Sequence, residues 1–429
     1  MKKFKIFAFL LLSGLIVQAQ QPLSLTDAIA KALENNYDIL LAKGDQQVAE
    51  IKNNWGAAGR YPYINLSASD NNSYVIQESD NNISNRFSGG TSLSWTIFDG
   101  FSVKISKARL DELENISKNN TATMVEGTIQ SIILAYYDVL LQKEKLVTYE
   151  EVMNLSNDRY EREKQRKEYG SAVTYEVLQA QNAYLEDRAS YLLQEVAYKN
   201  SRRNLGYLMA EKENTDYHLS EKFEAVLEEY LLADLLTQML ENNKSLQTQF
   251  INLRLLDNQI ASSKSAYSPY LDFNGGVTGT TTRMKTVEQD ASWSKNATLY
   301  GNFTLGWNLF SGGNRKRAVQ IAEIDRELGD VQLADIQHNL SNRLANLFEF
   351  YEVRKELLVL AKENLEAARL NMQISREKFE SGAINSFNYR DVQQIYLNAA
   401  QGELQAIYYF IDAQTSLLRL AGVIVQQYD

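Results

Sequence analysis

The residues that most often carry catalytic chemistry are scarce in this chain. It contains no cysteine and two histidines, His218 and His338, which lie 120 positions apart. A Cys–His nucleophile and a metal site of histidine and cysteine ligands are therefore not available. The chain also lacks a G-x-S-x-G segment, the sharp turn that exposes a catalytic serine in many hydrolases. We expect no catalytic residues, no bound metal and no cofactor.

The remaining reactive groups are carboxylates, ammonium groups and guanidinium groups, and many of them stand in mixed runs. Residues 161–168 form such a run, with acidic and basic side chains interspersed. Runs of this kind are typical of the solvated face of a coiled coil. The chain has 44 basic and 54 acidic residues, for a formal charge of −10. This excess of acid disfavours nucleic acid as a partner, because nucleic acid binds to basic surfaces.

One long segment, residues 101–168, must position the charged run. From 101 to 169 the chain has no proline and one glycine, Gly127. Apolar side chains recur at seven-residue steps through it: Ile132, Val139, Leu146, Met153 and Tyr160. This spacing predicts a helix with one apolar seam, about 100 Å long at the usual helical rise. A helix of that length does not fit a compact domain, so we expect an elongated molecule.

The same pattern occurs twice, which predicts an internal duplication. With an offset of 212, Trp95, Phe98, Gly100 and Gly170 match Trp307, Phe310, Gly312 and Gly382. With an offset of 207, Leu33-Glu34-Asn35-Asn36 matches Leu240-Glu241-Asn242-Asn243. Each half is therefore expected to be one structural unit. We place the first repeat at 20–210, a linker at 211–231, the second repeat at 232–422 and a tail at 423–429.

The first 19 residues have the pattern of a secretory signal peptide. Three lysines precede an apolar run, and Val17-Gln18-Ala19 offers a small-residue cleavage site. A membrane anchor is the alternative, but the apolar run is short for a spanning helix. Without the three lysines the formal charge is −13. Beyond residue 19 no run of 18 apolar residues occurs, so we expect an exported chain to enter a membrane only through β-strands.

Two segments, 61–98 and 268–310, alternate between apolar and polar residues. Each predicts two strands around a polar loop, with one apolar and one wet face, as in a membrane barrel wall. Aromatic residues stand at the strand ends near the helices, where an aromatic girdle at the membrane interface would lie: Tyr63, Trp95, Tyr270 and Trp307. A soluble sandwich edge with one solvated face is the alternative interpretation.

Helices of two lengths surround these strands. We expect the long helices at 101–168 and 313–380, each followed by a glycine turn and a return helix at 174–209 or 386–421. The helices that open the repeats, 25–58 and 232–265, are also about half as long as the long ones. A short helix and a return helix could therefore stack end to end beside each long helix.

Four strands are too few to close a barrel, because the smallest membrane barrels have about eight. Several chains must then share one barrel. Two chains would give about eight strands, whose interior is filled by side chains, and three would leave a lumen. A conducting pore therefore requires three chains or more.

At this point the sequence resembles the TolC-like outer-membrane efflux protein family of Gram-negative bacteria. The resemblance covers the chain after the signal and rests on the duplicated order of strand, strand, long helix, turn and return helix. Local motifs also carry it: Ala135-Tyr136-Tyr137-Asp138-Val139-Leu140, Tyr169-Gly170, Val177-Leu178-Gln179-Ala180-Gln181, the prolines at 62 and 269, and Trp-x-x-Phe-x-Gly before each long helix.

The resemblance implies an α+β membrane protein in the outer membrane, with a large periplasmic portion. Each chain would give four strands to a trimeric twelve-stranded β-barrel in the lipid and helices to a long antiparallel helical barrel. It also implies a passive conduit that catalyses nothing. A periplasmic adaptor protein would join this homotrimer to an inner-membrane pump or a secretion ATPase. The alternative is a periplasmic coiled-coil adaptor or spacer without a membrane barrel.

The same resemblance assigns roles to the helical tips. Adaptors of the family dock around the turn glycines, which here are Gly170-Ser171-Ala172 and Gly382-Ala383-Ile384. The alternative is that these glycines only reverse the chain.

The family also carries acidic gate residues inside the tips, at positions that correspond to Glu176, Asn388 and Asp391. Three Asp391 carboxylates would form a ring that favours cations, or Asp391 is simply a solvated helix charge. The polar partners of the family are replaced by Phe379 and Ile384. Closure is therefore expected to depend on apolar packing, or on Arg390 near Glu176.

Overall fold

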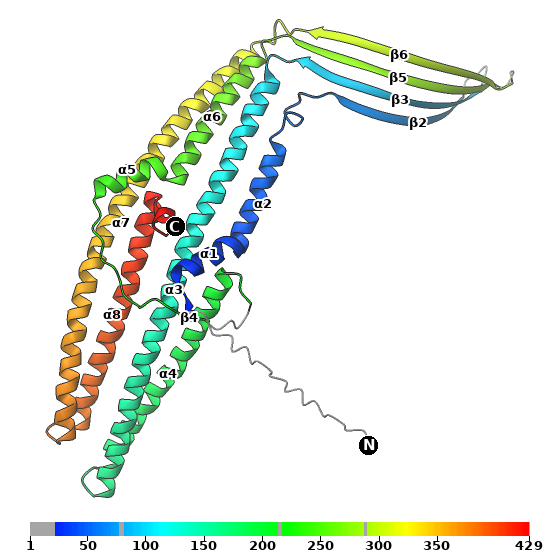
Figure 1. The fold of residues 1–429 in the computed structure, drawn as a ribbon. Coiled ribbons are helices and arrows are strands. Elements are labelled where there is room, and N and C mark those ends of the chain that lie inside the picture. Colours follow the sequence, from blue (N-terminus) through cyan, green and yellow to red (C-terminus); the bar gives the residue numbers. More distant parts are fainter. Residues whose placement is uncertain (1–21, 77–80, 213–216, 287–289, 429) are drawn as a thin grey trace, which may run out of the picture.

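The chain forms an elongated molecule with a sheet at one end and long helices running away from it (Figure 1). The computed structural model describes residues 22–76, 81–212, 217–286 and 290–428. The expected signal peptide at 1–19 lies outside the described residues.

The first repeat and the linker contain β1 (Pro22–Leu23), α1 (Leu25–Asn35), α2 (Tyr37–Lys52), β2 (Tyr63–Val75), β3 (Asn82–Phe98), α3 (Ser102–Glu168), α4 (Thr174–Leu208) and β4 (His218–Leu219). The second repeat contains α5 (Leu232–Asn242), α6 (Lys244–Ser265), β5 (Tyr270–Thr286), β6 (Ser292–Gly306), α7 (Asn314–Glu380), α8 (Ser386–Ala421) and α9 (Ile424–Tyr428).

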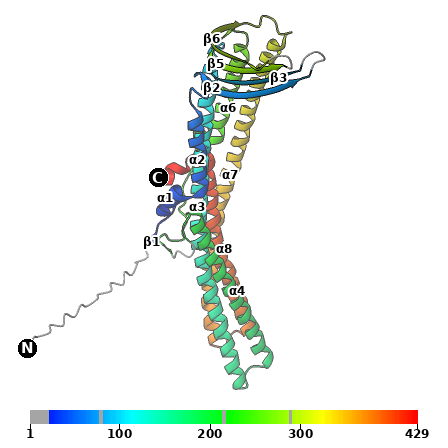
Figure 2. The same ribbon diagram turned by 90° about the vertical axis from the view of Figure 1, so that its right-hand side faces the viewer.

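The four long strands make one antiparallel sheet in the order β2-β3-β5-β6. Each repeat supplies one hairpin, and β3 pairs with β5 to join the repeats. Because side chains alternate across a strand, the register gives the sheet one polar face and one mainly apolar face. The mainly apolar face also carries Asp70, Arg283, Lys285 and Lys295, in the half of the sheet away from the helices. The outer strands β2 and β6 each have one unpaired edge, and the sheet curves across the end of the helices (Figure 2).

The helices follow the same lateral order as the strands. α3 and α7 have 67 residues each. Close to the sheet, α2, α3, α6 and α7 lie side by side in that order, and towards the tips α4, α3, α8 and α7 do so (Figure 1). The edges of this helical layer are therefore α2 and α4 on one side and α7 on the other.

The heptad seam is buried throughout α7 but only in part of α3. In α7, the side chains of Leu344, Tyr351 and Leu358 are 0% exposed. In α3, Ile132 and Val139 are buried, whereas Leu146, Met153 and Tyr160 are half-buried. The buried positions of the lower part of α3 are instead Val152, Ser156, Arg159 and Glu163. The predicted apolar seam of α3 is therefore wrong below the middle of the helix, where polar side chains face the neighbouring hairpin.

The opening helix of each repeat is broken, contrary to the prediction of continuous helices at 25–58 and 232–265. The breaks lie at Asn36 and Asn243, which correspond in the two repeats. The Asn36 side chain accepts hydrogen bonds from the backbone N–H groups of Asp38 (3.0 Å) and Ile39 (3.3 Å), and so caps α2. Its amide also donates to the carbonyl of Leu208, the last residue of α4, at 2.8 Å.

Asn243 makes the equivalent contacts in the second repeat. Its side chain accepts from the N–H of Leu246 (3.1 Å) and donates to the carbonyl of Leu420 (3.0 Å) near the end of α8. Thus α2 meets α4, and α6 meets α8, end to end beside the long helices. A single asparagine satisfies backbone groups of both helix ends at each junction.

The main apolar core lies at the level of these junctions. It includes Tyr136 and Phe410, which are 0% exposed, and it receives α1, α5 and α9. The linker contributes β4, a strand that the sequence did not predict, which pairs with β1 in parallel. The Tyr136 hydroxyl donates to the carbonyl of Leu23 in β1 at 2.8 Å.

This core accounts for the most apolar part of α3. Among the described residues, α3 is the helix whose length and composition alone would allow it to cross a membrane, with a mean hydropathy of 1.2 over its most apolar window. In the structure, 56% of that window is buried within the chain. The apolar side chains of α3 are therefore core residues of the helical layer.

Candidate functional site

The two tips at the far end of the helices are built alike. Gly170 (φ +74°) and Gly382 (φ +78°) both adopt the left-handed conformation after a long helix. The N–H of Gly170 donates to Lys167 (2.9 Å) and that of Ser171 to Arg166 (2.8 Å), which is a Schellman motif. Gly382 and Ala383 repeat these bonds in the second tip, at 3.1 and 2.8 Å.

Both turn glycines lie open to solvent. At either position, no other atom lies within 4 Å of the place that a Cβ would take. The neighbouring Ser171 and Ala383 are exposed, and Ala172 and Ile384 are partly exposed. The tips therefore present bare backbone and small side chains.

Glu176 and Asn388 occupy the third position of their return helices. The Glu176 carboxylate accepts a hydrogen bond from the backbone N–H of Val173, the residue that precedes α4, at 3.2 Å. The backbone N–H of Asn388 donates to the side chain of Asn385, the N-cap of α8, at 2.8 Å. Both residues thus belong to helix caps, which gives Glu176 a structural role within the chain.

Phe379 is an interior residue of the second hairpin. Its ring is 6% exposed and stacks on that of Tyr389 at 4.6 Å, with an interplanar angle of 8°. The Arg162 guanidinium of the first hairpin lies 4.9 Å from the centre of the Phe379 ring. Ile384 packs against the same small apolar cluster. Apolar packing therefore holds the second tip.

Asp391 is exposed on α8, and no ion pair involves it among the described residues. In a single chain it is a solvated carboxylate.

One expectation placed Arg390 near Glu176. Within the described residues of the chain, the hydrogen bonds of the Arg390 side chain go to other residues. Its guanidinium instead makes a bidentate ion pair with Asp187 of α4, at 2.5 and 2.8 Å. It also donates to the Ser156 hydroxyl of α3 at 3.2 Å, and that hydroxyl donates to Asp187. The side chains of Asp187 and Arg390 are 7% and 19% exposed. Arg390 therefore ties the second hairpin to both helices of the first.

Further buried polar groups surround this ion pair. Arg159 of α3 is 3% exposed and donates to the carbonyl of Ser386 at 3.3 Å. Burial, together with the nearby Arg390 guanidinium, lowers the pKa of Arg159 to about 10. Glu163 is 0% exposed and accepts two hydrogen bonds from Arg166. The contact between the hairpins near the tips therefore contains buried polar groups beside the apolar cluster around Val152, whereas the contact at the main core is apolar.

The four girdle aromatics divide between the two faces of the sheet. Trp95 pairs with Phe273 on the apolar face, and its indole N–H donates to the carbonyl of Arg60 at 3.0 Å. Trp307 donates to the carbonyl of Tyr267 in the same way at 2.9 Å. Tyr63 pairs with Ser94, and Tyr270 with Gly306, on the polar face. Because their strand positions differ in parity, the two tyrosines lie on the face of the sheet opposite to Trp95.

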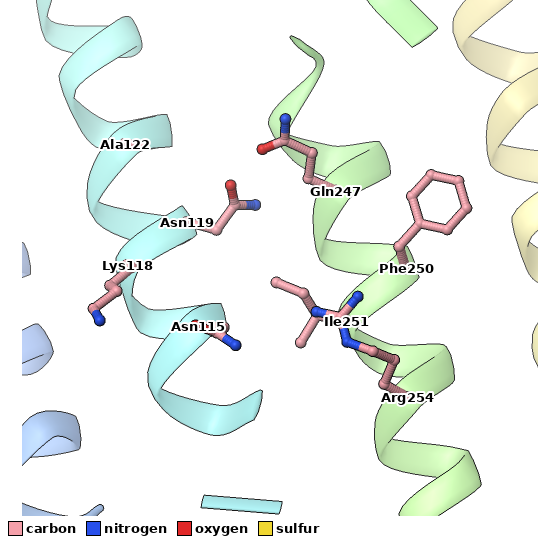
Figure 3. A pocket seen from close by; sticks show the side chains of 8 residues that line it. All are labelled: Asn115, Lys118, Asn119, Ala122, Gln247, Phe250, Ile251 and Arg254. Atoms are coloured by element: carbon pink, nitrogen blue, oxygen red, sulfur yellow. The ribbon is translucent and has the colours of Figure 1, made fainter. Parts of the chain in front are cut away.

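The seam between the repeats contains an open groove of about 450 Å³ between α3 and α6 (Figure 3). Asn119 at its centre donates to the carbonyl of Lys244 and to the Thr248 hydroxyl, both at 2.6 Å. Arg254, at the end of the groove nearer the sheet, binds the Glu112 carboxylate through two hydrogen bonds of 2.8 Å. These contacts join the repeats.

In the part of the chain that the structure describes, no cluster of three or more His, Cys, Asp or Glu side chains could hold a metal ion.

The comparisons with known proteins agree with this duplicated architecture. A model of the outer membrane efflux protein family matches residues 28–211 and again 235–423. The chain belongs to this family. The two matches cover one repeat each, as the internal duplication requires. A comparison with curated protein sequences gives no match.

Solved outer-membrane channels share the fold at low sequence identity. CusC is 16% identical, with a TM-score of 0.74 over 94% of this chain and 93% of CusC. The Campylobacter jejuni CmeC outer membrane channel is 16% identical, with a TM-score of 0.74 over 93% of this chain and 86% of CmeC. The open state of the Neisseria gonorrhoeae MtrE outer membrane channel is 15% identical, with a TM-score of 0.70 over 93% of this chain and 89% of MtrE.

Family and fold together fix the general role of the protein. It is an outer-membrane efflux channel, with its strands in the outer membrane and a large periplasmic part made of the helices. The family is one of transport conduits rather than enzymes.

Two features of the site were missed by sequence reasoning. The Asp187–Arg390 ion pair left no signal, because its partners lie 203 positions apart in different repeats. The two capping asparagines were visible in the sequence, since Asn36 and Asn243 end the matched Leu-Glu-Asn-Asn segments. An asparagine repeated in the middle of a predicted helix favours a cap.

Proposed function

We propose that this protein is the outer-membrane channel of a tripartite efflux or type I secretion system. It acts as a homotrimer and as a passive conduit, and catalyses no reaction. A periplasmic adaptor protein joins its helical tips to an inner-membrane pump or secretion ATPase, and outer-membrane lipid surrounds its strands.

The observation that carries this proposal is the pair of open edges. The sheet has four strands with β2 and β6 unpaired on their outer sides, and its apolar face includes Leu66, Leu299 and Leu305, which are 84%, 84% and 72% exposed. An unpaired strand edge cannot stand in lipid, because its N–H and C=O groups would lack partners. Pairing β6 of one chain with β2 of the next removes both edges, and three chains give about twelve strands around a lumen.

The edges of the helical layer support the same arrangement. Exposed apolar side chains follow the outer surfaces of α2, α4 and α7: Leu40, Leu41, Val48, Ile51, Leu178, Leu185, Leu192, Val196, Ile321, Ile324, Leu328 and Val331. In a ring of chains, α7 of one chain lies against α2 and α4 of the next. That contact would cover these residues, as apolar patches of this extent require.

The tips are the proposed contact with the adaptor and the proposed gate. The open turns at 170–172 and 382–384 offer the adaptor an accessible surface. The gate is formed by Asp391 with Glu176 and Asn388 close to the tips, and by the packing of Phe379. Arg390 contributes through its ion pair with Asp187.

Fractionation and bilayer recording test this proposal. The protein should remain in the outer-membrane fraction after a salt wash and dissolve only in detergent. Unheated, it should migrate as a trimer in SDS, and the purified trimer should conduct ions across a planar bilayer. A periplasmic adaptor or spacer would instead leave the membrane in salt. A monomer that is soluble without detergent would refute the channel.

A further inference from the structure

The polar face of the sheet is nearly free of charge. Since the opposite face is apolar and meets lipid, the polar face lines the lumen if the protein forms the proposed channel. Strand by strand it consists mainly of Ser, Thr, Asn and Gly. Within the described strands, Arg86 and Asp272 are the charged residues on this face.

Three tyrosines interrupt this hydroxyl and amide surface: Tyr63, Tyr270 and Tyr300, which we call the tyrosine collar. The register places them at the same end of the sheet, with Tyr63 and Tyr300 on its two outer strands. Tyr63 of β2 pairs with Ser94 of β3, which pairs with Asn274 of β5. Tyr300 of β6 pairs with Gly276, two residues after Asn274 on β5. Tyr270 lies on the same face of β5. All three therefore fall within about 20 Å along the strands, at the end near the helices.

Glycines allow two of these rings to lie along the wall. Tyr270 lies across Gly306, where a Cβ would come within 2.2 Å of its ring. Tyr300 lies across Gly276, where a Cβ would come within 2.9 Å of its hydroxyl. Any other residue at these two glycines would push the rings away. Tyr63, Tyr270 and Tyr300 remain 66%, 44% and 37% exposed, so the collar offers aromatic surface to the lumen.

Asp272 places a carboxylate inside this collar. It lies on the polar face between Tyr270 and Asn274, and it accepts a hydrogen bond from the Thr96 hydroxyl at 2.8 Å. Arg86 does not neutralise it. Arg86 pairs with Thr282, ten residues from Asp272 along β5, which is about 33 Å at the usual strand rise.

We infer that the tyrosine collar and Asp272 form a binding site for organic cations at the helix-proximal end of the barrel. The inference rests on the proposed channel. An ammonium group is attracted to the exposed faces of tyrosine rings and to the Asp272 carboxylate, which makes no ion pair among the described residues. The alkyl groups of a quaternary ammonium ion also gain from contact with the rings. Small inorganic anions gain nothing from this site.

Tetraethylammonium is the probe for the test. The purified full-length channel is placed in a planar bilayer in potassium chloride, and tetraethylammonium is added from the side of the barrel. The wild-type potassium current should fall with a saturable dependence on tetraethylammonium. Replacing both rings in Tyr270→Leu/Tyr300→Leu should raise the half-effect concentration about tenfold, because two cation–π contacts are lost.

Three variants separate this site from other effects. Tyr270→Phe/Tyr300→Phe keeps the rings and should remain within about twofold of wild type. Tyr74→Leu removes an exposed tyrosine from the opposite face of β2 and should change nothing. Asp70→Asn removes a carboxylate from the opposite face of the sheet and should leave the effect unchanged.

Asp272→Asn keeps the shape of the side chain and should raise the half-effect concentration about fivefold. It also serves if the leucine variant fails to form trimers. A wild-type channel that conducts but does not respond to tetraethylammonium would overturn the collar alone. An unchanged response in both the leucine and the Asp272→Asn variants would do the same. A wild-type protein that does not conduct at all would overturn the proposed channel itself.

Discussion

At the scale of single residues, a largely buried ion pair joins the two helical hairpins near their tips. The ion pair of Asp187 and Arg390 is largely buried, and Ser156 and Arg159 lie beside it. A buried pair is costly to form but more costly to break, because one charge is then left without a partner. The contact between the hairpins therefore depends on these specific polar side chains as well as on the apolar cluster around Val152.

Removing Asp187 should loosen this contact. Asp187→Ala leaves the Arg390 guanidinium and the Ser156 hydroxyl without their acceptor, which should cost about 3 kcal/mol of local stability. Amide hydrogen exchange should then become faster at the tips of both hairpins and stay unchanged at the main core. Glu186→Ala, a change of the same charge at the exposed neighbouring residue, is the control. Equal exchange in the two variants would show that the ion pair is not needed.

Asp391 has a different expected role, because it has no ion-pair partner among the described residues of the chain. In a trimer, three Asp391 carboxylates close to the tips would attract cations. Asp391→Ala should therefore lower the ratio of cation to anion permeability, measured from the reversal potential in a salt gradient across a bilayer. An unchanged ratio would mean that Asp391 is a solvated helix charge.

At the scale of elements, two asparagine junctions hold the short helices in line. Asn36 and Asn243 each cap one helix and bind the last carbonyls of another. Each junction thus converts two half-length helices into one column that matches a long helix. Neither half could satisfy its terminal backbone groups alone in a buried position.

Asn36→Ala should test the first junction. It removes a cap and a buried hydrogen bond, so we expect it to lower the free energy of unfolding by about 2 kcal/mol. Thermal unfolding of the trimer in detergent provides the measurement. The control is Asn35→Ala, since Asn35 is exposed and, among the described residues, its side chain donates to the carbonyl of Lys31 in its own helix. If both variants unfold alike, the junction does not contribute to stability.

The tip turns allow the chain-reversal role of glycine to be separated from adaptor binding. Asparagine tolerates the left-handed conformation, and both positions have free space for a side chain. Gly170→Asn/Gly382→Asn should therefore leave the amount of trimer unchanged. If the adaptor contacts the bare turn, the double variant should lose at least about tenfold in affinity for the purified adaptor. Wild-type affinity would mean that the glycines serve only to reverse the chain.

At the scale of the whole molecule, the absence of cysteine makes the arrangement of chains directly testable. Cysteine at Leu66 of β2 can be combined in turn with cysteine at Leu299, Phe303 or Leu305 of β6, which share its face. One of these pairs should give disulfide-linked dimers and trimers under oxidation, because β2 of one chain then adjoins β6 of the next. Leu66→Cys alone should give no disulfide-linked trimer, because one cysteine per chain can link at most two chains. If none of the three double-cysteine variants gave disulfide-linked species under oxidation, the proposed barrel would be excluded.

The sequence by itself determined the properties that repeat along the chain. Seven-residue spacing, strand alternation and the offsets of 212 and 207 predicted the long helices, the four strands and the duplication. These signals are local, because a period of 3.5 or 2 residues specifies a helix or a strand wherever it occurs. The count of four strands then pointed to several chains, since the smallest membrane barrels have about eight strands.

Only the tertiary structure decided which residues meet. Tyr63 and Trp95 both stand at strand ends, but the register places them on opposite faces. The heptads of α3 continue past Leu146, yet the helix turns a polar surface to its neighbour because Asp187 and Arg390 come from other helices. Contacts between residues about 200 positions apart depend on how the repeats pack together. A period along one segment carries no information about that packing.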